Sequence, residues 1–449
     1  MYLFFCAESF LKSTYREVFK AITSLALKTG HFLRHWRILL PILIIAVSLH
    51  SFLGRAISIR SRVSGESSSA QLTWAKTYGG ADQDEGWYVQ QTSDGGYIAV
   101  GETWSSGAGW NDVFVVKADA QGNVQWTKTY GGPDSDFGYS IQQTSDKGYI
   151  IVGGTMSSGA GSSDVYLIKV DTKGDTQWSR TYGGPNVEIG YAVQQTTDGG
   201  YVIVGETNSF GAGKKDIYLI KTDSKGKVQW TRTYGGPKDD SGKFVRQTSD
   251  GGYIIAGYTE SFGNGDMDVY LVKTDEKGQL QWSRTYGGRN LDVASSLEQT
   301  KDSGYVVVGG TILSDGGSYD VYLIKTDANG QIQWSKTYGG SGADWGNSVK
   351  QTSDEGYVIA GWTTSGHGGM DFYLVKTDAK GEIQWAKTYG GPKDDSARCV
   401  QRTSDGGYVI VGYTESLGTG KRDLYMIKAD SNGDLENQNN SSLINSLGR

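Results

Sequence analysis

The sequence is dominated by a repeat of about 52 residues, which restricts the folds open to this chain. Tryptophan recurs at spacings of 52, 52, 52, 52, 52 and 51 residues, each time starting the segment Trp-x-(Lys/Arg)-Thr-Tyr-Gly-Gly. The residues are Trp74, Trp126, Trp178, Trp230, Trp282, Trp334 and Trp385. A short unit that cannot bury its own apolar faces has to stack on copies of itself, so this period indicates a solenoid or a propeller.

Each repeat unit contains four strand-like runs. In the unit Gln125–Thr176 they are Gln125–Tyr130, Tyr139–Thr144, Tyr149–Thr155 and Val165–Val170. These runs are rich in β-branched and aromatic residues, and the last two are almost continuously apolar, which is typical of strands covered on both faces. Turn segments such as Ser-Asp-Lys-Gly separate the runs, and no helical period appears. The sequence therefore predicts an all-β domain.

Seven units of four strands predict a seven-bladed β-propeller of four-stranded antiparallel blades over residues 72–435. An open β-solenoid is the alternative, although its coils are usually shorter. One Trp run, Leu72–Tyr78, precedes the first complete blade, and no such run follows Leu424–Ala429. We therefore predict that Leu72–Tyr78 closes the seventh blade beside Leu424–Ala429. The Trp run is then outermost in each blade, and the run of the Gly86–Thr92 type is innermost.

The signatures Trp-x-(Lys/Arg)-Thr-Tyr-Gly-Gly, Gln-Thr-Ser-Asp-Gly-Gly-Tyr and Asp-Val-Tyr-Leu-Ile-Lys-Thr-Asp resemble the β-propeller repeats of bacterial and archaeal secreted and surface proteins. The resemblance covers residues 72–435 and implies a propeller outside the cell, without implying one particular activity. The chain is more loosely similar to quinoprotein-type propellers, whose outer strands carry an Asp-x-x-x-Gly-x-x-x-Trp docking motif. In this chain Asp119, Gly122 and Trp126 stand in its place, with one residue fewer between Asp and Gly.

Residues 38–54 form an uncharged, largely apolar stretch between a basic segment, 1–37, and a linker, 55–71. Its length lies between that of a spanning helix and that of a signal-peptide core. We therefore predict one hydrophobic helix, either a transmembrane signal anchor or a cleaved secretion signal. More Lys and Arg precede this stretch than closely follow it, so the N-terminus is expected inside. Both alternatives place the propeller outside the cytoplasm, and the tail 436–449 is expected to be disordered.

Charge and residue counts exclude several function classes. Residues 63–449 carry 34 Lys or Arg and 47 Asp or Glu, a net charge of −13, which argues against a nucleic-acid partner. His367 is the only histidine and Cys399 the only cysteine in this part of the sequence, so a histidine-rich metal site is excluded. No Gly-x-Ser-x-Gly turn or phosphate-binding loop leads into a helix.

Acidic pairs occur in the links that follow four of the Gly-Gly segments. They are Asp82 with Asp84, Asp134 with Asp136, Asp239 with Asp240, and Asp394 with Asp395. Two carboxylates and neighbouring carbonyls are enough for a weak Ca²⁺ site, and the alternative is that they are solvated turn residues. They are poorly suited to glycoside hydrolysis, because each pair lies on one loop and no pair differs from the others. No other cofactor is expected.

Repetition separates the scaffold from a candidate site. The Trp, the Tyr before each Gly-Gly and a recurring Lys are expected to pack blades together, and turn aspartates such as Asp94 and Asp146 are expected to accept hydrogen bonds from backbone amides. Two links per blade are tight, and two are longer and vary. The two variable links of an up-and-down blade lie on the same face. We call this the variable face and predict that it binds the ligand.

Five tryptophans that depart from the repeat lie in or beside the variable links: Trp87, Trp104, Trp110, Trp345 and Trp362. They belong to the first and sixth blades, which flank the seventh, so we predict that they share one sector with His367. Exposed Trp rings bind sugars and proteins, and the alternative is that some fill the core between blades. The predicted function is a non-catalytic extracytoplasmic propeller that binds carbohydrate or protein. A polysaccharide hydrolase or lyase, a quinoprotein-like enzyme and a structural envelope platform are the alternatives.

Overall fold

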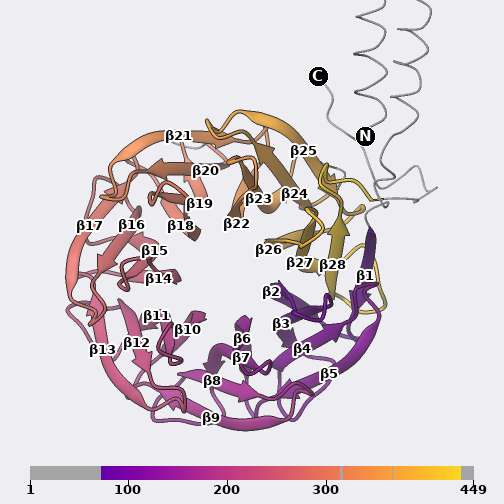
Figure 1. Ribbon diagram of the computed structural model, residues 1–449, viewed down its shortest axis with the longest axis horizontal. Coiled ribbons are helices and arrows are strands. Elements are labelled where there is room, and N and C mark those ends of the chain that lie inside the picture. Colours follow the sequence, from indigo (N-terminus) through magenta and orange to yellow (C-terminus); the bar gives the residue numbers. More distant parts are fainter. Residues whose placement is uncertain (1–71, 314–316, 367, 436–449) are drawn as a thin grey trace, which may run out of the picture. The chain divides into compact units, whose positions relative to one another are not determined.

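The computed structural model describes residues 72–313, 317–366 and 368–435, which form a seven-bladed β-propeller (Figure 1). Seven antiparallel sheets of four strands are arranged in a closed ring, which confirms the predicted fold in place of an open solenoid. Within these residues there is no helix long and apolar enough to cross a membrane. The hydrophobic helix predicted at 38–54, the linker before the propeller and the tail 436–449 lie outside the described residues.

Blades are numbered along the chain, and in each blade the first-named strand lies innermost and the last-named strand outermost. Blade 1 consists of β2 (Asp84–Gln91), β3 (Tyr97–Thr103), β4 (Asp112–Ala118) and β5 (Val124–Tyr130), and blade 2 of β6 (Asp136–Gln143), β7 (Tyr149–Thr155), β8 (Asp164–Val170) and β9 (Thr176–Tyr182). Blade 3 consists of β10 (Glu188–Gln195), β11 (Tyr201–Thr207), β12 (Asp216–Thr222) and β13 (Val228–Tyr234), and blade 4 of β14 (Asp240–Gln247), β15 (Tyr253–Thr259), β16 (Asp268–Thr274) and β17 (Leu280–Tyr286). Blade 5 consists of β18 (Asp292–Gln299), β19 (Tyr305–Ile312), β20 (Tyr319–Thr326) and β21 (Ile332–Tyr338), and blade 6 of β22 (Asp344–Gln351), β23 (Tyr357–Thr363), β24 (Asp371–Thr377) and β25 (Ile383–Tyr389). Blade 7 consists of β26 (Asp395–Arg402), β27 (Tyr408–Thr414), β28 (Asp423–Ala429) and β1 (Trp74–Tyr78).

The ring is closed by strands from opposite ends of the described chain. Strand β1 pairs antiparallel with β28, with Trp74 opposite Lys428 and Tyr78 opposite Leu424. Figure 1 shows β1 on the outer edge beside β28, and β2 and its six counterparts nearest the axis. The predicted closure and the predicted order of strands within a blade are therefore confirmed.

The inner strands begin earlier than the sequence predicted. Strand β6 spans Asp136–Gln143, whereas the pattern predicted Tyr139–Thr144. The pairing of β6 with β7 shifts register between Gly138 and Ser140, so a β-bulge interrupts the alternation of side chains. A pattern that relies on alternation detects only the part of the strand beyond the bulge.

The core lies between the blades. Every residue of β7 is buried, as the continuous apolar run predicted. Ile98 and Val113 of blade 1 belong to the same buried cluster as Ile141 and Ile168 of blade 2. Each blade therefore buries its two faces against its neighbours, which one four-stranded sheet cannot do alone.

Each outermost strand fastens its blade to the next one. Tyr78 Oη donates a hydrogen bond to the carbonyl oxygen of Gly122 at 2.7 Å, and Trp74 Nε1 donates to that of Ala120 at 2.9 Å. Gly122 has a φ of 73°, and a Cβ atom there would lie 2.9 Å from the Trp74 ring. The same bond joins Tyr130 to Gly174, Tyr182 to Gly226, Tyr234 to Gly278, Tyr286 to Gly330, Tyr338 to Gly381 and Tyr389 to Gly433. The expected inter-blade role of the recurring Trp and Tyr is confirmed.

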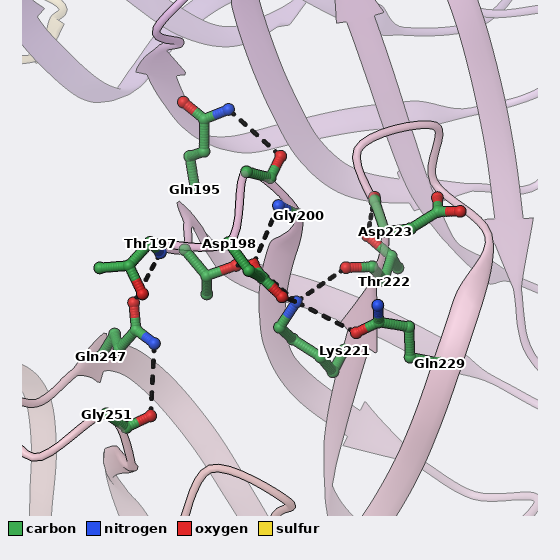
Figure 2. A network of polar contacts seen from close by, with 12 residues as sticks. Gln195, Thr197, Asp198, Gly200, Lys221, Thr222, Asp223, Gln229, Gln247 and Gly251 are labelled. Atoms are coloured by element: carbon green, nitrogen blue, oxygen red, sulfur yellow. Dashed lines mark hydrogen bonds and ion pairs between the residues drawn. The ribbon is translucent and has the colours of Figure 1, made fainter.

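The recurring lysine was predicted to join blades, but it instead anchors a tight turn within its own blade. Lys221 Nζ donates hydrogen bonds to Asp198 Oδ2 at 2.8 Å, to the carbonyl oxygen of Thr222 at 2.9 Å and to Gln229 Oε1 at 3.3 Å. These residues are drawn in Figure 2. Asp198 also accepts a bond from the amide of Gly200, as expected for a turn aspartate. Desolvation by burial raises the pKa of Asp198. The hydrogen bonds that the carboxylate accepts from Lys221, Thr196 and Gly200 have the larger combined effect, so the pKa of Asp198 is lowered overall. The three acceptors replace the water that the buried lysine loses, which offsets the cost of its burial.

Candidate ligand-binding face

The two variable links of each blade lie together on one face of the ring, as predicted. In blade 1 the amide of Trp104, after β3, donates a hydrogen bond to the carbonyl oxygen of Gln83, before β2, at 2.8 Å. Equivalent bonds join Met156 to Ser135 and Asn208 to Val187 in the next two blades. The variable face is thus a continuous surface made by both sets of links.

The second member of each predicted acidic pair holds these links in place. Asp84 is fully buried, and its Oδ2 accepts hydrogen bonds from the amide of Gly80 and from Ser105 Oγ, both at 2.7 Å. Asp136, Asp240 and Asp395 are buried in the same way. The described part of the chain contains no group of three or more His, Cys, Asp or Glu suited to a metal ion. Calcium binding by these loops stays a prediction.

A β-bulge in every inner strand leaves one residue out of its ladder, on the strand nearest the axis of the ring. In blade 1 the register of β2 against β3 shifts between Gly86 and Tyr88, so Trp87 is left out of the ladder. All seven bulged residues are half-buried, so solvent reaches them. We call them the mouth ring: Trp87, Tyr139, Tyr191, Lys243, Ser295, Asn347 and Arg398.

The mouth ring is not symmetric. Trp87, Tyr139 and Tyr191 form an aromatic arc over blades 1–3, with ring centroids 5.3 Å and 5.4 Å apart along it. A cation covers each end of the arc, because Arg398 lies 4.5 Å over Trp87 and Lys243 lies 3.8 Å over Tyr191. The two remaining members, on blades 5 and 6, are the small polar residues Ser295 and Asn347. The mouth therefore has an aromatic side and a small polar side.

The next residue of each inner strand rejoins the ladder after the bulge. These residues are Tyr88, Ser140, Ala192, Phe244, Ser296, Ser348 and Cys399, and all except Tyr88 are buried. Tyr88 of blade 1 extends far enough for its Oη to accept hydrogen bonds from Gln401 Nε2 of blade 7 at 3.0 Å and from Arg246 Nη2 of blade 4 at 3.4 Å. These bonds link blade 1 to blades 7 and 4, so the side chain of Tyr88 extends across the centre of the ring.

Buried glutamates lie behind the mouth ring, and their surroundings differ. Glu102 of blade 1 accepts hydrogen bonds from Asn111 Nδ2 at 3.0 Å and from Trp87 Nε1 at 3.4 Å. Burial, reinforced by the negative charge of Glu85, raises the pKa of Glu102 to about 7. Glu85 forms an ion pair with Arg422. This side of the mouth therefore changes charge near neutral pH.

Glu206 occupies the equivalent position in blade 3 and has two lysines beside it. Its carboxylate lies 2.9 Å from Lys215 Nζ and 3.4 Å from Lys243 Nζ, and it accepts a 2.6 Å bond from Ser241 Oγ. Burial raises the pKa of Glu206, but the lysines and the hydroxyl reverse the effect, so the net pKa is lowered. Glu206 therefore stays ionised where Glu102 takes up a proton.

We expect the substitution Glu102→Gln to stabilise the protein at pH 8 and not at pH 4.5. The folded pKa of about 7 lies above the ordinary glutamate value of 4.5, so stability is fully present below pH 4.5 and is lost as the pH rises through about 7. Removing the charge should recover up to about 3 kcal/mol at pH 8, as measured by urea denaturation at both pH values. The matched substitution Glu206→Gln should destabilise the protein at pH 8, because it leaves Lys215 and Lys243 without their carboxylate. A gain from both substitutions at pH 8 would contradict this assignment.

The structure separates the tryptophans singled out from the sequence. Trp104 and Trp110 lie in the β3–β4 link of blade 1 and are 38% and 77% exposed, whereas Trp87 lies in the mouth ring. Trp345 faces blade 5, where its ring meets Tyr319 at 5.3 Å and its Nε1 bonds to Ser295 Oγ at 3.0 Å. Trp362 pairs with Trp345 in the β22–β23 ladder, and His367 lies outside the described residues. The blade 6 tryptophans thus pack away from blade 7, and their role in binding stays a prediction.

Of the mouth ring, the sequence singled out Trp87 alone and missed the other six members: Tyr139, Tyr191, Lys243, Ser295, Asn347 and Arg398. A sequence signal for these residues does exist. Each one follows the Gly or Ala at the third position of its inner strand, where the pairing with the next strand shifts register. By residue type, Tyr139 and Tyr191 carry no distinctive sequence signal, because aromatic residues are common in strands. The bulge that sets them apart can be recognised only from the pairing of the inner strand with its neighbour in the structure.

Comparison with known proteins supports the architecture. No family model matches the chain. Regulatory protein FlaEY of Caulobacter vibrioides is 29% identical over 167 residues, which cover 31% of this chain and only 17% of that protein. A puromycin hydrolase variant complexed with PGG is structurally similar, with a TM-score of 0.50 and 15% identity over 78% of this chain and 52% of that chain. The Pan2 WD40 domain of Neurospora crassa has a TM-score of 0.47 and 12% identity over 80% and 96% of the two chains. The likeness to the puromycin hydrolase variant shows the fold alone.

Proposed function

We propose that this protein is a non-catalytic binding protein that recognises carbohydrate at the mouth ring on its variable face. The observation that carries the proposal is that the mouth-ring residues vary from blade to blade, although the strands that carry them repeat. The seven mouth-ring positions hold six residue types, whereas the first position of the same strands is Asp in six blades and Glu in one. Side chains that differ and meet solvent, on a scaffold that repeats, are suited to selecting a ligand.

The chemistry of the mouth favours a sugar. The faces and edges of Trp and Tyr rings pack against the C–H faces of sugars, and small polar side chains opposite them exchange hydrogen bonds with hydroxyl groups. The aromatic arc faces Ser295 and Asn347 in this way. Trp110, which is 77% exposed on the same face, offers further stacking surface to a longer chain of sugars.

We place this binding outside the cytoplasm. Two features of the sequence support that location: the resemblance to repeats of secreted and surface proteins, and the apolar stretch 38–54 ahead of the propeller. In this proposal the stretch acts as an anchor or as a secretion signal, and the propeller presents its variable face to extracellular polysaccharide.

The test is a glycan-array screen of the full chain in mild detergent beside two variants, Trp87→Ala and Phe210→Ala. Phe210 is 44% exposed in the β11–β12 link of blade 3 and is not part of the mouth ring, so it serves as the control. We expect a sugar signal that Trp87→Ala reduces by about tenfold or more and Phe210→Ala leaves unchanged. A signal unaffected by either variant would move the site elsewhere. A blank array with a cooperatively melting protein would overturn carbohydrate recognition and favour a protein partner.

A further inference from the structure

Arg398 is a charged member of the mouth ring that forms no hydrogen bond within the described part of the chain. Its Nε is buried without a partner, and no other atom of the guanidinium is bonded to a described residue. The guanidinium lies instead between two rings, 4.5 Å from the centroid of Trp87 and 5.4 Å from that of Tyr413. A guanidinium carries five N–H donors, and none of those of Arg398 is paired with a described residue, so the group is available to bind an external acceptor.

The neighbouring carboxylates do not satisfy this arginine. Glu85 is engaged by Arg422, and Glu102 by Trp87 and Asn111. Burial of the guanidinium lowers the pKa of Arg398, and Glu85 and Glu102 act on it only by charge–charge interaction at a distance. The charge of Arg398 is thus tolerated at this position but is not neutralised by direct contact.

Lys243, the cation at the other end of the aromatic arc, is already engaged. Its Nζ lies 3.4 Å from Glu206 Oε2 and 3.8 Å from the centroid of the Tyr191 ring. The two ends of the arc therefore differ. The blade 4 end is internally paired, and the blade 7 end presents unpaired donors beside Trp87.

We propose that the mouth ring binds an acidic sugar, with the guanidinium of Arg398 holding the sugar's carboxylate while the sugar ring packs on Trp87 and Tyr139. This inference rests on the proposed carbohydrate recognition and specifies its ligand as a hexuronic acid residue. A planar guanidinium fixed by aromatic faces matches a carboxylate through two parallel hydrogen bonds. Beside Arg398, Asn347 of the neighbouring blade 6 donates its amide to the carbonyl oxygen of Ala397 at 2.7 Å, which leaves its own side-chain oxygen to accept from a sugar hydroxyl.

The experiment compares acidic oligosaccharides with their neutral counterparts. Isothermal titration of the full chain uses oligosaccharides of glucuronate, galacturonate and mannuronate, each beside the same oligosaccharide with its carboxyl groups reduced to alcohols. A charge-assisted hydrogen bond contributes about 1.5–3 kcal/mol, so reduction should weaken binding of the preferred sugar by about ten- to a hundredfold. In Arg398→Gln, confirmed as folded by its thermal transition, the acidic and the reduced forms should bind equally.

The control variant is Arg402→Gln, an exposed arginine at the far end of the same strand, which should keep the preference for the acidic form. Equal binding of acidic and reduced forms by the unmodified protein would overturn this inference and leave carbohydrate recognition standing. The same holds if Arg398→Gln retains the preference. If the unmodified protein binds no member of the panel and the glycan array is also blank, the proposed function fails together with the inference.

Discussion

A chain that begins at residue 82 should lose the cooperative unfolding of the ring, whereas a chain that begins at residue 71 should keep it. The shorter chain lacks β1, whose five residues pair with β28 and whose Tyr78 and Trp74 bond to the β4–β5 turn of blade 1. Without β1, the paired edge of β28 and the joint between blades 7 and 1 are exposed together. We expect the midpoint of thermal unfolding to fall by more than about 10 °C, since a few kcal/mol shift a midpoint by several degrees.

Differential scanning calorimetry of the two truncated chains measures this effect. The chain beginning at residue 71 retains every described strand and controls for the loss of the N-terminal segment. If both chains melted like the full protein, closure by β1 would contribute nothing to the stability of the ring.

The substitution Gly205→Ala should be among the most destabilising single changes in this protein. Gly205 of β11 faces Gly190 of β10 beside the bulge that exposes Tyr191, and a Cβ atom at residue 205 would lie 1.7 Å from the carbonyl oxygen of Ile189. Backbone cannot yield as a flexible side chain does, so the inner strand would have to move. We expect a loss of more than about 4 kcal/mol in the free energy of unfolding, measured by urea denaturation.

Gly199→Ala, in the tight turn of the same blade, is the matched control. Gly199 has a φ of 81°, and a Cβ atom there would meet nothing within 4 Å. Its cost should be limited to the strain of a left-handed alanine, about 1–2 kcal/mol. If Gly205→Ala cost no more than Gly199→Ala, the close approach at the bulge would not be what requires glycine.

The scaffold could be predicted from the sequence because each of its features occurs seven times. The spacing of the Trp residues gave the number of blades, and the spare run at Leu72–Tyr78 gave the closure. The tight turns were recognisable from their Asp and Gly residues. The ion pair between Lys221 and Asp198 was not predicted, although both residues recur, because they lie 23 positions apart and nothing in a linear pattern pairs them.

Apart from Trp87, the mouth ring could not be predicted in the same way. Its members occur once per blade and differ from blade to blade, so the repeat that revealed the scaffold does not mark them as a group. Whether Arg398 faces the mouth or the core depends on a one-residue shift in register between Ala397 and Cys399. Such a shift moves a side chain from one face of a strand to the other, and it cannot be detected from the alternation of apolar residues in the sequence.

The offset between repeat and blade, which places β1 in blade 7, has a consequence for how the gene can change in length. A unit that starts at its Trp supplies its first strand to the preceding blade and its other three strands to the following one. Gain of one whole unit by unequal recombination would therefore add one blade and leave β1 and β28 to meet as before, provided the neighbouring blades adjust their angles. The number of blades is then set by the number of units inherited, and the interlocking closure is preserved through each such event.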